Sequence, residues 1–78
     1  MKHIPVGTIV CVERTDPGEE EGEKQLIPAI VTGQWPTGSL QLYAFHFEGS
    51  PVLFRDVPLD RVYMVGMREP VEPRKVFA

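Results

Sequence analysis

The sequence predicts an all-β protein, a small five-stranded SH3-like barrel with one short helical turn before the last strand. Two observations lead to this prediction. Eight prolines and seven glycines interrupt the 78-residue chain every few residues, and in a helix interior Pro and Gly cost about 3 and about 1 kcal/mol. Between the interruptions lie short runs rich in Val, Ile, Leu, Phe and Tyr, which is the pattern of strands in a small sandwich or barrel.

The runs predicted as strands are residues 8–13, 27–35, 40–47, 52–55 and 61–65. Residues 14–24 form a long polar loop after the first strand, and its central part, 15–23, is expected to be exposed. Residues 56–60 form the helical turn before the last strand. A long first loop, short later connections and this turn match the SH3-like plan. We place the barrel domain in residues 1–67 and an extended C-terminal tail in residues 68–78.

Three local signals refine this plan. Pro28 has no N–H for a strand ladder, so it is expected at the start of its strand or on a sheet edge. Gly33 predicts a bend or bulge in the same strand. In the helical turn, Asp56 is the candidate cap and Pro58 fits the first turn.

The charge distribution disfavours a general nucleic-acid binder, because such modules usually carry a basic face. The formal net charge is −3. Residues 13–24 hold six acidic and two basic side chains, a local net charge of −4, and the rest of the chain holds five acidic and six basic, a net of +1. The acidity therefore belongs mostly to one loop, which we interpret as a solvated loop.

Cys11 is the only cysteine, so no internal disulfide framework and no cysteine-based zinc site is expected. No apolar run approaches the roughly 18 residues of a membrane span. The first residues lack the apolar stretch of a signal peptide. These features favour a reducing, cytosolic context without a membrane partner.

The most informative functional feature is an aromatic stripe on the third strand. By period-2 alternation, Tyr43, Phe45 and Phe47 share one face of that strand. The opposite face carries Leu40, Leu42, Ala44 and His46. A barrel has one core, so one of these two apolar faces is either covered by a loop or buried against another chain. Trp35 lies beside a turn at a strand end, where an aromatic side chain anchors an interface or packs in the core.

No catalytic, metal or cofactor signature accompanies these residues. His3 and His46 have no neighbouring His, Cys, Asp or Glu at ligand spacing, and no nucleophile motif or phosphate-binding loop is present. Arg55 and Arg61 are the candidates for a basic contact. We therefore expect neither an enzyme nor a cofactor.

Three segments resemble a family of small bacteriophage and prophage β-proteins of unassigned activity. They are Pro28-Ala29-Ile30-Val31-Thr32 with Trp35 shortly after, the strand Leu40-Gln41-Leu42-Tyr43-Ala44-Phe45, and Val57-Pro58 after a short strand. The resemblance covers residues 6–65. It implies a viral or prophage origin, a location in the host cytoplasm or in the virion, and a small binding or virion-associated role.

A second segment, Gly38-Ser39-Leu40-Gln41-Leu42-Tyr43, is similar to the Gly-Ser-Val-Gln-Ile-Tyr segment lining the active pore of the type II dihydrofolate reductases. Those enzymes are tetramers of SH3-like subunits. The segment departs from that family in position, because it lies one strand earlier than the next-to-last strand.

Three functions follow from the sequence. The first is a non-catalytic phage-type module that acts through contacts with another protein chain, which includes a second copy of itself. The second is a nucleic-acid-binding SH3-like domain, which requires Lys2, Arg55 and Arg61 to converge with Tyr43. The third is a small-ligand binder or reductase built at an oligomer axis.

Overall fold

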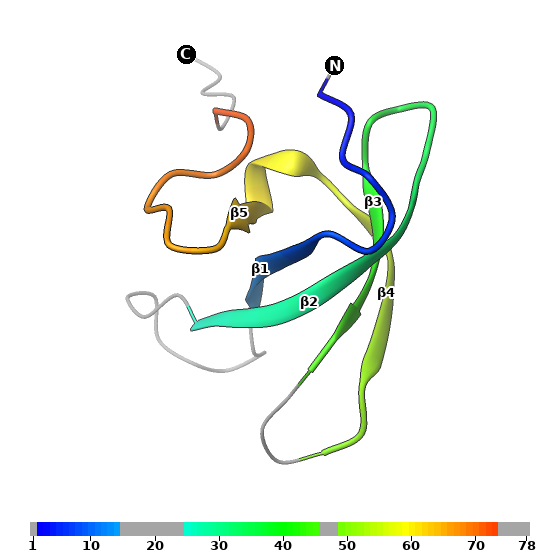
Figure 1. The fold of residues 1–78 in the computed structure, drawn as a ribbon, viewed down its shortest axis with the longest axis vertical. Helices are drawn as coiled ribbons and strands as arrows, with labels where there is room; N and C mark the ends of the chain where they lie inside the picture. The colour runs from blue at the N-terminus through cyan, green and yellow to red at the C-terminus, as the bar shows by residue number, and fades with distance from the viewer. Residues whose placement is uncertain (1, 15–24, 46–48, 74–78) are drawn as a thin grey trace.

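The chain folds into one antiparallel sheet of five strands (Figure 1). The computed structural model describes residues 2–14, 25–45 and 49–73. The strands are β1 (Ile9–Arg14), β2 (Gln25–Gln34), β3 (Leu40–Ala44), β4 (Val52–Val57) and β5 (Val62–Met64), with a 3-10 turn, η1 (Leu59–Arg61), before β5. No other helix occurs in the described ranges, and the predicted fold class is confirmed.

The strand order is β4-β3-β2-β1-β5. Each pair of neighbours is antiparallel, and the ten-residue β2 lies at the centre of the order. The two edge strands, β4 and β5, are consecutive in the chain and are joined through η1. This order, with a single helical turn between the edge strands, is the arrangement expected of an SH3-like barrel.

The core lies on the inner face of the sheet, where alternate residues of every strand point. Leu40, Leu42 and Ala44 of β3, which the alternation places on one face, are fully buried. The other buried apolar residues of the core cluster are Ile4, Val10, Val12, Ile27, Ala29, Val31, Val57, Leu59 and Val62. Phe54 and Val71 pack against this cluster from its margin.

The expected position of Pro28 was wrong, because Pro28 is the fourth residue of the central strand β2. Its carbonyl oxygen accepts a hydrogen bond of 2.8 Å from the N–H of Phe45. In an antiparallel ladder the N–H and C=O of one residue face the same neighbour. The missing donor of Pro28 therefore faces Phe45, one residue beyond the end of β3, and the sheet loses little.

The predicted cap of the helical turn was also wrong. Asp56 belongs to β4, which continues to Val57 because Val57 pairs with Leu40 of β3. Pro58 is the N-cap of η1, and no side chain caps it. The bulge predicted at Gly33 is confirmed, since the β2–β3 register shifts between Val31 and Gly33.

Two terminal segments are attached to the barrel. The Gln34 side chain accepts a bond of 3.0 Å from the N–H of Ile4 and donates bonds of 2.7 and 3.0 Å to the carbonyl oxygens of Lys2 and Gly38. Residues 68–73 belong to the predicted tail. Within them, the N–H of Val71 donates to Val62 at 2.7 Å. The expected exposure of loop 15–23 falls outside the described residues.

Candidate functional site: the outer apolar face

The outer face of the sheet carries a row of apolar side chains across four strands. Directly paired residues of neighbouring strands share a face. Ile9 of β1 pairs with Ile30 of β2, Ile30 pairs with Tyr43 of β3, and Tyr43 pairs with Leu53 of β4. None of the four belongs to the core cluster, so the row lies on the side of the sheet away from the core.

A second row lies beside the first. Cys11 of β1 pairs with Pro28 of β2, and Phe45 continues the row through its hydrogen bond to Pro28. On its other side Cys11 pairs with Tyr63 of β5, which is only 6% exposed and is not part of the open surface. We call the two rows together the outer apolar face, and its members are Ile9, Cys11, Pro28, Ile30, Tyr43, Phe45 and Leu53.

Solvent reaches this face despite its apolar character. The exposed fractions are 50% for Ile9, 42% for Tyr43 and 44% for Phe45. The two faces of β3 therefore differ: Leu40, Leu42 and Ala44 form core, and the described aromatic side chains of the stripe lie at the surface. Contiguous exposed apolar patches on soluble proteins mark interaction sites.

Trp35 lies at the turn that follows β2. Its backbone N–H donates to Ser39 at 2.8 Å, and its carbonyl oxygen accepts from Gly38 at 2.8 Å, which closes the turn into β3. The indole Nε1 donates to the carbonyl oxygen of Arg55 on β4. The ring is thus held in place by β4 while 47% of the side chain stays exposed, which suits a pre-positioned contact residue.

Charged residues stand at opposite corners of this face. Glu13 continues β1 beyond Cys11, and its carboxylate accepts a bond of 3.2 Å from the Tyr63 hydroxyl. Arg55 and Asp56 lie in β4, where the register with β3 shifts between Leu40 and Leu42. The two rows themselves contain no Asp, Glu, Lys or Arg.

The structure places two of the four predicted interface residues, Tyr43 and Phe45, on the outer apolar face, and it places Trp35 at the turn after β2, opposite Ser39. Phe47 lies outside the described residues. Sequence reasoning missed Ile9, Ile30 and Leu53, which complete the first row. Alternation within one strand separates its two faces, but it does not show which residues of neighbouring strands pair. The alignment of these three residues with Tyr43 was therefore not visible in the sequence.

The candidate basic residues do not share one location with Tyr43. Arg55 is on the edge strand β4, whereas Arg61 ends η1 beside β5 at the other edge of the sheet. The Lys2 amine donates a bond of 3.2 Å to the carbonyl oxygen of Val71, on the segment attached to β5. These cations are distributed over both edges and do not form a patch around the ring.

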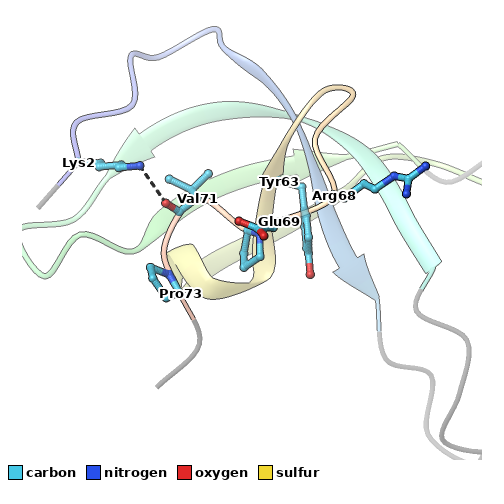
Figure 2. A pocket seen from close by; sticks show the side chains of 7 residues that line it. Lys2, Tyr63, Arg68, Glu69, Val71 and Pro73 are labelled. Carbon is cyan, nitrogen blue, oxygen red and sulfur yellow. Dashed lines mark hydrogen bonds between the residues drawn. The ribbon is translucent and has the colours of Figure 1, made fainter. Parts of the chain in front are cut away.

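A shallow pocket lies where the two terminal segments meet, and its volume is about 660 Å³. It is lined by Lys2, Tyr63, Arg68, Glu69, Pro70, Val71 and Pro73. Figure 2 shows Lys2 directed toward Val71 and the Arg68 side chain directed away from both. The charged groups do not converge on one point, so the pocket offers no defined polar site.

Within residues 2–14, 25–45 and 49–73, no three His, Cys, Asp or Glu side chains are grouped to hold a metal ion. No helix in the described part of the chain is long and apolar enough to cross a membrane.

Comparisons with known proteins add no relative. No family model matches the chain, and no curated protein or solved structure matches it significantly. The structure alone therefore defines the class of the protein, which is a small all-β barrel domain with an apolar outer face.

Proposed function

We propose that the protein is a non-catalytic binding module that acts through protein–protein contacts made by the outer apolar face. The observation that carries this proposal is the cross-strand row Ile9–Ile30–Tyr43–Leu53, together with the exposure of 50% of Ile9 and 42% of Tyr43. In the isolated domain such an apolar row stays partly in contact with water, and covering it with another protein removes that apolar surface from water and lowers the free energy.

The composition of the site supports the same function. Interfaces are enriched in Tyr, Trp and Phe and depleted of charge at their centre. Tyr43, Phe45 and Trp35 supply the aromatic side chains, and the charged Glu13 and Arg55 stand at the margin. A virion-associated or host-directed role extends the proposal, and it is supported by the resemblance to the phage and prophage proteins alone.

Site-specific photo-crosslinking tests the proposal. Benzoylphenylalanine is placed at Tyr43, on the outer apolar face, and in a matched protein at Val65, which is 63% exposed in the turn after β5. Both proteins are produced in cells and irradiated. We expect protein adducts at Tyr43 that disappear when Phe45→Asp is added, and few adducts at Val65.

The Phe45→Asp change is suited to this test because Phe45 lies outside the core cluster. Circular dichroism of the variant is expected to match the parent, so lost adducts report the surface and not the fold. Equal adduct yields at Tyr43 and Val65 in the folded protein would rule out the outer apolar face as a binding surface.

A further inference from the structure

The geometry points to a second copy of this chain as the occupant of the outer apolar face: we propose a two-fold symmetric dimer centred between the two apolar rows, near Ile30 and Tyr43. This inference rests on the proposed function and names its partner. In a two-fold interface the residues beside the axis meet their own copies, so the centre of the face must tolerate contact with itself.

The centre of the face meets this condition. Ile30 and Tyr43 occupy the middle strands of the first row, with Pro28 and Phe45 beside them in the second. None of these residues is Asp, Glu, Lys, Arg or His. Self-contact there buries apolar surface without placing like charges together.

The charged corners also suit a two-fold axis. The registers place Glu13 four residues beyond Ile9 on β1, and Arg55 two residues from Leu53 on β4 in the opposite direction along the sheet. The midpoint between these corners falls between β2 and β3, among the central residues. A two-fold axis that lies in the plane of the face, passes through that midpoint and runs perpendicular to the line joining the two corners brings Glu13 of one copy toward the partner's Arg55, so that unlike charges meet. Asp56 lies next to Arg55, so the net charge of the Arg55 corner is small.

The exposed area indicates how strong the dimer is. Ile9, Tyr43 and Phe45 are 42–50% exposed, and with about 150–250 Å² per large side chain they present roughly 200–350 Å². A standard interface buries about 800 Å² per partner. The outside of a barrel is convex, so the contact is closest at its middle. We therefore expect a weak dimer, with a dissociation constant in the range of roughly 10 μM to 1 mM.

The size of the domain favours the same arrangement. A chain of 78 residues buries only about 60% of its unfolded surface, and self-association is one of the ways in which small domains gain stability. The core cluster uses one face of the sheet. Dimer formation through the other face covers the remaining apolar rows.

Complementary charge variants test the dimer directly. Tyr43→Lys and Tyr43→Glu are made separately, with Val65→Lys and Val65→Glu as controls on an exposed residue elsewhere. Sedimentation equilibrium from about 10 μM to 1 mM measures self-association, and circular dichroism checks the fold. We expect the parent and both Val65 variants to dimerise, and each Tyr43 variant alone to associate at least about tenfold more weakly.

The equimolar mixture of Tyr43→Lys and Tyr43→Glu is the decisive sample. In a two-fold dimer centred here, a positive side chain then lies near a negative one, so we expect the mixture to associate more strongly than either variant alone. A mixture that stays as weakly associated as its components overturns this two-fold arrangement.

The remaining outcomes separate this inference from the proposed function. A folded parent that is monomeric up to 1 mM while the Tyr43 crosslinker still captures another protein overturns the dimer and leaves the binding face standing. A parent dimer that only the Val65 variants disrupt, with no adducts at Tyr43, overturns both.

Discussion

Replacing Gln34 by Ala is expected to detach the N-terminal segment from the barrel. The Gln34 amide makes three hydrogen bonds, to the backbones of Ile4, Lys2 and Gly38. Ile4 is 7% exposed and belongs to the core cluster. One side chain at the end of β2 therefore holds residues 2–4 against the barrel and also braces the turn at Gly38.

The magnitude follows from these contacts. Each net hydrogen bond contributes about 1 kcal/mol, and the bond to Lys2 is solvent-exposed and contributes least. Burial of an Ile side chain is worth about 1.5–3 kcal/mol, part of which is lost if Ile4 leaves the core. We expect Gln34→Ala to lower the free energy of unfolding by about 2–4 kcal/mol, and Tm by roughly 10–20 °C for a domain of this size.

Urea denaturation and hydrogen exchange measure the effect. Gln41→Ala is the matched control, because the Gln41 amide makes one long bond of 3.3 Å to the Thr32 hydroxyl, and its expected cost is below about 1 kcal/mol. The hydrogen-exchange rate of the Ile4 amide is expected to rise in Gln34→Ala and to stay the same in Gln41→Ala. A loss in Gln34→Ala no larger than in the control, with Ile4 still protected, would refute the reasoning.

Three further predictions follow from the fold. Leu42→Ala is expected to lower the free energy of unfolding by about 2–5 kcal/mol in urea denaturation, since Leu42 is 0% exposed and its removal leaves a cavity. Tyr43→Ala, measured at low protein concentration, is expected to cost far less. Equal losses in the two variants would contradict the assignment of the two faces of β3. Gly38→Ala is expected to cost about 1–2 kcal/mol, because Gly38 has φ +99° and a Cβ strains that conformation; a neutral change by thermal melting would contradict the turn. Trp35→Phe keeps an apolar ring but loses the hydrogen bond to Arg55, and thermal melts are expected to show a loss of about 0.5–1.5 kcal/mol. An unchanged stability would mean that the indole makes no such bond in solution.

Local signals in the sequence were sufficient for the strands themselves. The density of Pro and Gly excluded long helices, and period-2 alternation identified Leu40, Leu42 and Ala44 as one face of β3, which is buried. Gly33 marked the bulge in β2 because a residue without a side chain suits an irregular ladder. These inferences depend on residues close together in the chain, and the structure agrees with them.

The errors came where pairing between distant segments overrode a local preference. Pro28 was expected near an edge, yet β3 ends opposite it and leaves its missing N–H without consequence. Asp56 has the side chain of a helix cap, but pairing of Val57 with Leu40 keeps β4 extended past it. Tertiary hydrogen bonds outweigh such preferences, which are worth about 1 kcal/mol.

The sequence by itself determined the all-β class, the five strands, the helical turn before the last of them and the two-faced character of β3, because Pro, Gly and alternation act over a few residues. Only the tertiary structure decided which face of β3 is core. It also decided that Ile9, Ile30 and Leu53 line up with Tyr43. Register between strands is set by hydrogen bonds between residues far apart in the chain, and a shift of one residue moves every side chain to the other face. For that reason the aromatic stripe was visible in the sequence, and the apolar surface of which it forms part was not.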